Sequence, residues 1–260
     1  MKQISTIIIA LMLYSQLALC QVIPSYLSEL DYSTNIDYIN STPLTLFHNQ
    51  VAVDTLGVVN SQLSPSKIWN IRGARVDGYH RDSTGLNYFS FDTDVTIDGI
   101  SISKNDIIRC NDNNCDTLSL YFLNFFNNSQ FNINAFSIDP TNGDVLFTVD
   151  SSTYLFPSMP VLPSTIIRYK AATGYSYEYT PYVDDPTKNI DALSYLPNNK
   201  FLYSLENDDK FNLIYIYDPL TDTNEIAYTP LSFSASTFGR LDIMSLMATF
   251  NNSIFNDGFE

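Results

Sequence analysis

The chain has few of the residues on which most metal sites and nucleic-acid interfaces depend. Its 260 residues include two His, three Cys and one Trp, and its 13 Lys and Arg stand against 28 Asp and Glu. So few His and Cys supply zinc or haem sites poorly. The formal net charge of -15 argues against binding to nucleic acids or anionic membranes, because phosphate groups are neutralised by clustered Lys and Arg.

Apolar and aromatic residues are abundant. They make up 45% of the chain, and 18 Tyr and 17 Phe are among them. This composition is too apolar for a disordered chain and sufficient for a core. After residue 20 no segment is long and apolar enough to span a bilayer. The length allows one all-β domain or two small domains.

Residues 1–20 have the layout of a secretory signal peptide. Lys2 precedes a mostly apolar run from Ile4 to Leu19, which is shorter than the roughly 20 residues of a spanning helix. Ala18 and Cys20 fit the -3 and -1 positions of a cleavage site. Alternatively, the segment resembles a bacterial lipoprotein signal in which Cys20 carries the lipid, although Leu19 departs from the small residue expected there. Both interpretations predict a secreted or periplasmic protein.

Cys110 and Cys115 lie close together in the sequence RCNDNNCD. Export favours a disulfide between them, because oxidising compartments preserve such bonds. In the chain-entropy model so short a loop contributes about 2 kcal/mol. The alternative, a pair of metal ligands, lacks two further ligands nearby.

An internal repeat organises the chain. The segments 76–92, 133–150 and 190–206 each begin with an apolar residue, then Asp or Asn, then Gly or Ala. A turn and a second apolar run follow, and this run ends in Ser or Thr, an apolar residue and an acid. Third runs lie at 106–110, 165–169 and 213–217, and fourth runs at 118–126, 175–180 and 224–230. Alternation, Tyr, Phe, Ile and Val enrichment and intervening turn residues predict strands throughout.

The chain ends predict closure of a ring. Asp242 opens a unit that the C-terminus cannot complete, and the segments 25–31, 46–56 and 66–72 supply its second, third and fourth strands. Units of four strands are typical of a β-propeller. We therefore predict an all-β fold over residues 21–250, a small β-propeller of four four-stranded antiparallel blades closed by pairing of the N- and C-terminal segments, followed by a tail at 251–260. A two-sheet sandwich built from the same hairpins is the alternative.

The sequence of the first complete unit, VDGYHR followed by SFDTDVTIDGISISKNDIIR, resembles repeat segments of uncharacterised exported bacterial proteins with propeller-like blades. The tail IFNDGFE is similar to a short tail on secreted proteins of Gram-negative bacteria, or is simply a solvated chain end. This resemblance implies the fold and carries no catalytic residue.

Recurring acids are the candidate site. Propeller symmetry predicts one ring near the mouth of the channel and a second ring at the ends of the second strands, where Asp31 would be the fourth member. Calcium, which takes six to eight oxygen ligands, suits such rings, whereas backbone hydrogen bonds within the blades are the structural alternative. The first ring comprises Asp77, Asn134, Asp191 and Asp242, and the second Asp92, Asp150 and Glu206.

Other candidates have simpler structural explanations. The segments 139–144 and 218–222 lack the spacing of a calcium loop and fit turns between strands. Asp92, Asp94 and Asp98 form a local acidic patch in a loop, which is a weaker candidate for cation binding. The alternating tyrosines of 175–182 suit either sugar stacking or blade packing. His80 fits a satisfied polar residue of an inner strand, and Arg109 and Arg168 fit pairing with the acids.

The expected function follows from a scaffold without a recognisable catalytic motif. No Gly-x-Ser-x-Gly elbow occurs. We expect an exported, monomeric, non-enzymatic β-propeller that binds a protein or a glycan. The alternative is a calcium-assisted hydrolase or lyase with an axial acidic site.

Overall fold

The computed structural model describes residues 27–34, 38–39, 45–46, 51–55, 58–63, 68, 74–112, 115–122, 131–156, 159–180, 188–196, 198–206, 213–228 and 243–250. The predicted signal peptide, the tail 251–260 and Asp242 lie outside these residues.

Four antiparallel sheets of four strands each make up the fold, and each is one blade. The strands are given from the innermost to the outermost. Blade 1 contains β22 (Ile243–Phe250), β1 (Leu27–Thr34), β4 (Val51–Thr55) and β5 (Val58–Leu63). Blade 2 contains β6 (Val76–Arg81), β7 (Asn87–Phe91), β10 (Ile107–Cys110) and β11 (Leu118–Phe122). Blade 3 contains β12 (Ile133–Ile138), β13 (Val145–Val149), β16 (Ile166–Lys170) and β17 (Gly174–Tyr179). Blade 4 contains β18 (Asn189–Tyr195), β19 (Phe201–Glu206), β20 (Ile214–Asp218) and β21 (Thr223–Tyr228).

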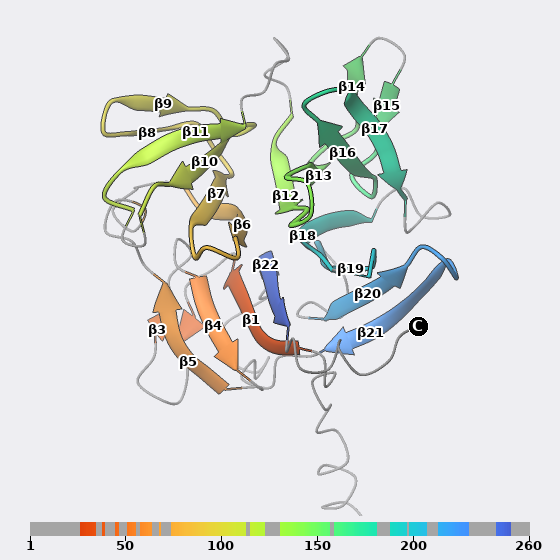
Figure 1. The fold of residues 1–260 in the computed structure, drawn as a ribbon, viewed down its shortest axis with the longest axis horizontal. Helices are drawn as coiled ribbons and strands as arrows, with labels where there is room; N and C mark the ends of the chain where they lie inside the picture. Colours follow the sequence, from red (N-terminus) through yellow and green to blue (C-terminus); the bar gives the residue numbers. More distant parts are fainter. Residues whose placement is uncertain are drawn as a thin grey trace, which may run out of the picture.

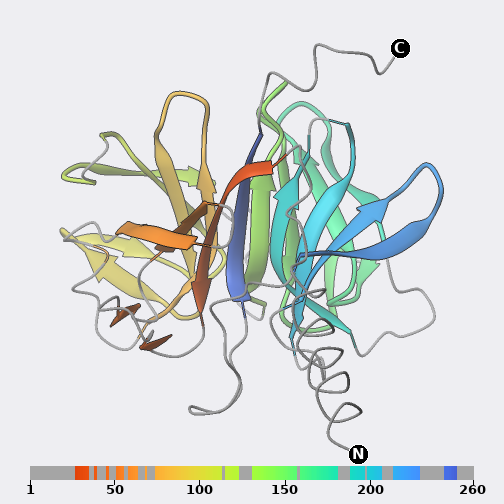
Figure 2. The ribbon, with the colours of Figure 1, turned by 90° about the horizontal axis from the view of Figure 1, so that it is seen from below.

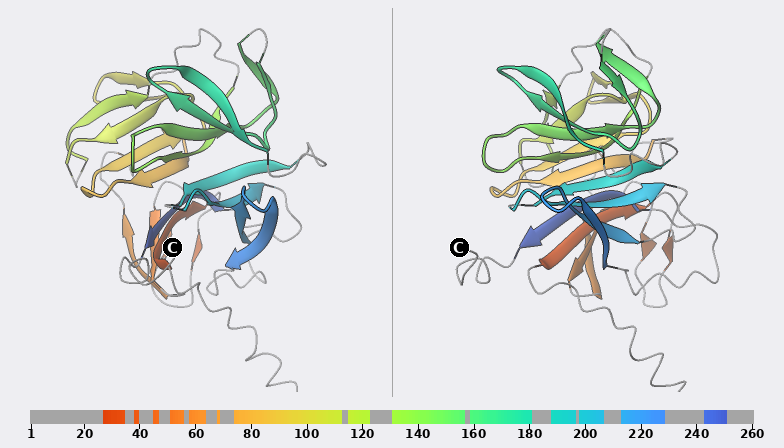
Figure 3. Two further views of the ribbon diagram at one scale, coloured as in Figure 1. Left: turned by 45° about the vertical axis from the view of Figure 1, so that its right-hand side comes forward. Right: turned by 90° about the vertical axis from the view of Figure 1, so that its right-hand side faces the viewer.

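The blades surround a common centre (Figures 1 and 2). The innermost strands β6, β12, β18 and β22 lie side by side in a circle, each beside the next. The circle closes because β22 pairs with β1, with Leu30 opposite Ala248 and Tyr32 opposite Leu246. Figure 3 shows these two strands, from opposite ends of the chain, next to each other. The predicted four-bladed β-propeller closed by its terminal segments is confirmed.

Burial explains the sequence pattern of the strands. All six residues of β12 and all five of β7 and β13 are buried, because both faces of an inner strand pack against neighbouring blades. Such strands need not alternate strictly between apolar and polar residues, and the sequences NYFSF, INAFSI and VLFTV are mostly apolar. The largest fully buried side chains include Tyr79, Phe136 and Tyr203, and full burial of a large apolar side chain contributes about 1.5–3 kcal/mol.

The N-terminal blade differs from the prediction in two places. Its fourth strand is β5, at Val58–Leu63, and not the segment 66–72. Ile68, the one residue of that segment that the structure describes, has helical backbone and packs into the core of blade 2. Asp31 pairs with Met247 inside β1, whereas the other predicted members of the second ring end or follow their strands. Asp31 therefore does not belong to that set.

Within the described residues, three blades carry a two-stranded ribbon between their second and third strands. These ribbons, which the sequence did not predict, are β2–β3 (Tyr38–Ile39, Thr45–Leu46), β8–β9 (Val95–Ile97, Ile100–Ile102) and β14–β15 (Thr153–Phe156, Met159–Val161). In an antiparallel meander the connection between strands two and three lies at the end where strand one begins. All three ribbons therefore extend from one face of the ring, which we call the ribbon face.

Cys110 and Cys115 form a disulfide, as predicted, with an S–S distance of 1.99 Å. It links the end of β10 to the turn before β11, and both residues are fully buried. A disulfide indicates an oxidising environment. Among the described residues, no helix has the length and apolar character needed to cross a membrane.

Candidate functional site

An extra residue interrupts the pairing of each innermost strand near its start. In β6 the register passes from Val76 opposite Phe91 to Gly78 opposite Ser90, so Asp77 is the extra residue of a β-bulge. The same shift makes Asn134 and Asp191 the extra residues of β12 and β18. In β22 the extra residue is Met244, and Asp242 lies two residues earlier. A bulge re-aims its side chain, so the recurring acids and amides stand at one structural position in three blades.

Hydrogen bonds join these bulges to the following blade. The amide Nδ2 of Asn132, in blade 3, donates to Oδ2 of Asp77 in blade 2. Nδ2 of Asn134 donates to Oδ1 of Asp191 at 3.3 Å and to Oδ1 of Asn189 at 3.2 Å, both in blade 4. The structure thus brings Asn134 and Asp191 of the first predicted ring into contact. It also places Asp77 against an amide that the sequence argument had missed.

The second set of acids binds within its own blade. The Nε of Arg75 donates to Oδ2 of Asp92 at 2.8 Å, and the backbone N–H of Asn132 donates to Oδ1 of Asp150 at 3.0 Å. Nδ2 of Asn189 donates to Oε2 of Glu206. Each acid thus fastens the end of its second strand to the residue two before the bulge.

Arg75, Asn132 and Asn189 belong to this hydrogen-bond network and were not predicted from the sequence. A signal was present, because each stands two residues before a bulge residue, in RVD, NIN and NID. Each is a hydrogen-bond donor, so the recurrence marks the partner that the neighbouring acids need.

Burial dominates the electrostatics around the bulge residues. Asp77 is 1% exposed, and burial raises the pKa of its carboxyl well above the usual range, against the lowering effect of the Asn132 hydrogen bond. Partial burial alone would lower the pKa of Arg75, but its pKa is raised by Asp92, Asp77 and Asp191 together. Arg75 is therefore a partly exposed cation close to these acidic side chains.

One hydrogen-bond acceptor beside the bulge of β6 has no partner among the described residues. The side-chain oxygen Oδ1 of Asn132 is buried and accepts no hydrogen bond there. A buried oxygen in this condition is a place for a water molecule, a cation or a ligand donor. No three His, Cys, Asp or Glu side chains within the described ranges are grouped so that they could hold a metal ion.

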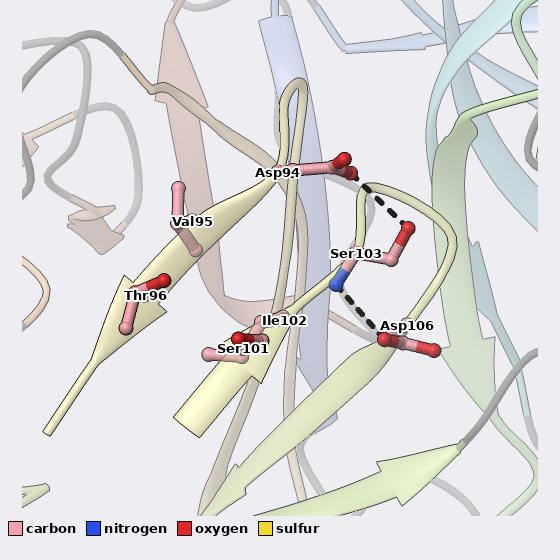
Figure 4. Close-up of a pocket in the computed structure, with 7 residues that line it drawn as sticks. All are labelled: Asp94, Val95, Thr96, Ser101, Ile102, Ser103 and Asp106. Atoms are coloured by element: carbon pink, nitrogen blue, oxygen red, sulfur yellow. Dashed lines mark hydrogen bonds between the residues drawn. The ribbon is translucent and has the colours of Figure 1, made fainter. Parts of the chain in front are cut away.

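A pocket lies beside the β8–β9 ribbon, on the ribbon face. It has a volume of about 370 Å³ and is lined by Asp94, Val95, Thr96, Ser101, Ile102, Ser103 and Asp106. Figure 4 shows Asp94 and Asp106 on either side of Ser103, with Thr96 and Ser101 on the two ribbon strands. Oδ1 of Asp94 accepts from the Ser103 hydroxyl at 3.1 Å and from the Lys104 N–H at 2.9 Å. Oδ2 of Asp106 accepts from the Ser103 N–H at 2.9 Å.

The three acids of the local acidic patch therefore have different surroundings. Asp92 is tied to Arg75, whereas Asp94 lines the pocket. Asp98 lies at the ribbon turn with a positive φ of 51° and is not among the pocket residues.

The remaining candidates have structural roles. Residues 139–144 form the turn between β12 and β13, where Asp139 and Asp144 both pair with buried Arg168 at 2.8 and 3.1 Å. Residues 218–222 form the turn between β20 and β21. The guanidinium of Arg109 donates to Oδ1 of Asn111 at 3.3 Å.

His80 and the tyrosine cluster are partly as predicted. His80 is buried on β6, but its Nδ1 has no hydrogen-bond partner in the described part of the chain, so it is not fully satisfied. Burial lowers its pKa to about 4. Tyr175 packs against Phe147, Tyr179 packs against Phe201, and Tyr177 remains 51% exposed. Tyr182 lies outside the described residues.

Comparison with known proteins finds only distant similarity to solved structures. No family model matches the chain, and no curated protein matches it significantly. A catalytically inactive virginiamycin B lyase from Staphylococcus aureus, crystallised with quinupristin, is 13% identical; the match covers 75% of this chain and 69% of the lyase, with a TM-score of 0.34. A structure of a nidogen–laminin complex is 9% identical over 85% of this chain and 97% of the other, with a TM-score of 0.35. The Swd1 β-propeller domain from Myceliophteria thermophila is 10% identical over 76% of this chain and 56% of the other, with a TM-score of 0.32. Similarity at this level carries no argument about activity or ligand.

Proposed function

We propose that this chain is an exported, non-enzymatic β-propeller that binds a protein or glycan partner through its ribbon face. The observation that carries the proposal is the insertion of a ribbon at the same connection in three blades. A ring needs no such insertions to close, and loops on a rigid scaffold are where binding residues concentrate. The pocket beside β8–β9 and exposed Tyr154 on β14 belong to these ribbons.

Binding screens with matched variants test this proposal. The purified protein is screened against a glycan array and a set of extracellular proteins. Tyr154→Ser alters the ribbon face, whereas Leu220→Ser alters an 87% exposed residue in the β20–β21 turn on the opposite face. We expect a hit that Tyr154→Ser weakens and Leu220→Ser leaves unchanged. A hydrolase or lyase activity in an unbiased substrate screen, abolished by one pocket substitution, would overturn the proposal.

Export is tested separately by the mature N-terminus. We propose cleavage after Cys20, so N-terminal sequencing of the protein recovered outside the cytoplasm should start at Gln21. A lipidated Cys20, detected by mass spectrometry, would instead indicate the anchored form. A chain recovered in the cytoplasm with Met1 intact would contradict export.

A calcium-assisted hydrolase or lyase is the second candidate. It is favoured by Oδ1 of Asn132, which lies beside buried Asp77 and has no hydrogen-bond partner among the described residues. The proposed ligands are drawn from Asp77, Asn134, Asp191 and Asp242, with Asp92, Asp150 and Glu206 in support. Metal analysis of the purified protein and melting with and without a chelator test this candidate. A melting temperature unchanged by chelation, with no bound metal, would exclude it.

A further inference from the structure

We propose that the pocket beside β8–β9 binds a protonated amine, which belongs either to a small molecule or to a side chain of a larger cationic ligand. This inference rests on the proposed function, since it assigns a ligand chemistry to one part of the ribbon face. It starts from the open pocket of about 370 Å³ and from the side chains that line it.

The lining offers acceptors and hydroxyls but no basic side chain. The polar side chains that line the pocket are those of Asp94, Thr96, Ser101, Ser103 and Asp106, and no Lys, Arg or His is among its seven residues. Asp94 is exposed, whereas Asp106 is 8% exposed and forms a buried carboxylate in the lining. An ion pair with such a carboxylate is screened less than one on an open surface.

Charge selects the ligand. Two carboxylates in one cavity repel anions, and the net charge of -15 attracts cations from a distance. An ammonium group brings three donors and one positive charge, which these carboxylates and hydroxyls can accept. A neutral sugar would find hydroxyl partners but no aromatic ring among the lining residues to stack on.

The ribbon holds this lining in place. Val95 is opposite Ile102 and Ile97 opposite Ile100, and these apolar residues pack into the core of blade 2. Thr96 and Ser101, which are opposite each other and exposed, stand on the other face of the ribbon. The backbone N–H groups of Ser103 and Lys104 fix the two carboxylates. Such preorganisation reduces the cost of ordering the site when a ligand binds.

Putrescine is the probe, and 1,4-butanediol is its uncharged control. Binding is followed in solution at low ionic strength by the NMR shifts of the backbone amides of Thr96 and Ser101. We expect saturable shifts with putrescine and none with butanediol. Asp94→Asn keeps an amide oxygen that accepts the Ser103 and Lys104 hydrogen bonds while it removes the charge, so it should weaken binding about tenfold.

Asp98→Asn is the matched control, because it removes the same charge from the same ribbon but outside the pocket. Asn also tolerates the positive φ of 51° at this position. Putrescine affinity should then change by less than about twofold, as expected for a rim charge. Equal losses in the two variants, shifts that never saturate, or identical shifts with butanediol would overturn the inference. If putrescine fails while a protein or glycan hit remains sensitive to Tyr154→Ser, the inference is wrong and the proposed function stands.

Discussion

The amide of Asn134 donates a hydrogen bond to the carboxylate of Asp191, 57 residues later, at 3.3 Å. The two residues are the β-bulges of adjacent innermost strands, so the contact joins blade 3 to blade 4. Asn132 and Asp77 make a corresponding contact between blades 3 and 2. The polar residues at the bulges thus hydrogen-bond one blade to the next. Any ligand that binds there must displace these hydrogen bonds or add to them.

Asp77→Asn tests whether Asp77 serves as a hydrogen-bond acceptor between blades or as a metal ligand. The folded-state pKa of Asp77 is raised, so its carboxyl favours folding below the pKa of the unfolded chain and loses that contribution as pH rises through the folded pKa. An asparagine oxygen still accepts from Asn132 without a buried charge. We expect the variant to be more stable than the parent at pH 8, with a smaller difference at pH 4, in urea unfolding at the two pH values. A variant less stable at both pH values, with loss of bound calcium, would indicate a metal ligand instead.

His80 gives the opposite pH dependence. Burial lowers its pKa from 6.5 to about 4, against the raising effect of Asp82, so the neutral ring stabilises the fold fully above pH 6.5. That contribution falls as pH drops towards 4, by up to about 3 kcal/mol. His80→Phe preserves an aromatic ring beside Tyr88 and removes the titration. Between pH 7 and 4.5 the parent should therefore lose stability relative to this variant, as measured by chemical unfolding. Parallel pH profiles would contradict the assignment.

The sequence predicted the strands of blades 2, 3 and 4 because turn residues separate alternating apolar runs. It did not predict the β8–β9 ribbon, since Asp92, Asp94 and Asp98 make that segment resemble a loop. In blade 1, the fourth strand β5 is VVNSQL, which does not alternate, whereas the segment SKIWNIR was predicted as that strand.

The candidate site was predicted less well, because register decides it. Asp242 matches Asp191 in sequence, yet the pairing of β22 with β1 places Met244 at the bulge. A shift of two residues keeps the same residues on each face of a strand while it changes which residue stands at the bulge. The donors Arg75, Asn132 and Asn189 were not predicted, because one Arg and two Asn do not recur as a single residue type.

Gly78 tests the packing between blades 2 and 3. Its φ is not in the left-handed region, but an added Cβ would lie 2.8 Å from Cε1 of Phe136 and 2.5 Å from Oγ of Ser90. Gly78→Ala should therefore destabilise the protein by about 1–3 kcal/mol through overpacking. Phe136→Leu removes part of the obstruction, so the double variant should lose less than the sum of the two single losses in thermal unfolding. Strictly additive losses would show that the two residues do not touch.

Arg168 tests the buried ion-pair cluster on the opposite face. Its guanidinium, 6% exposed, pairs with Asp139, Asp144 and Glu178 and lies 5.3 Å from the centre of the Tyr195 ring. Arg168→Met leaves buried carboxylates without their cation, so the free energy of unfolding should fall by about 3–5 kcal/mol. Lys200→Met, which removes a partly exposed pair with Asp218, should change stability far less. Equal losses in denaturant titrations would refute a special role for the buried cluster.

Closure of the ring by β1 and β22 is tested most directly by cysteine cross-linking. In a Cys20→Ser background, Leu30→Cys with Ala248→Cys places the new thiols on Cα partners of the two strands. Tyr32→Cys with Ala248→Cys is two residues out of register. The structure predicts rapid and nearly complete cross-linking of the first pair under mild oxidation, and little of the second. Failure of the first pair, or equal cross-linking of both, would contradict a propeller closed by its terminal strands.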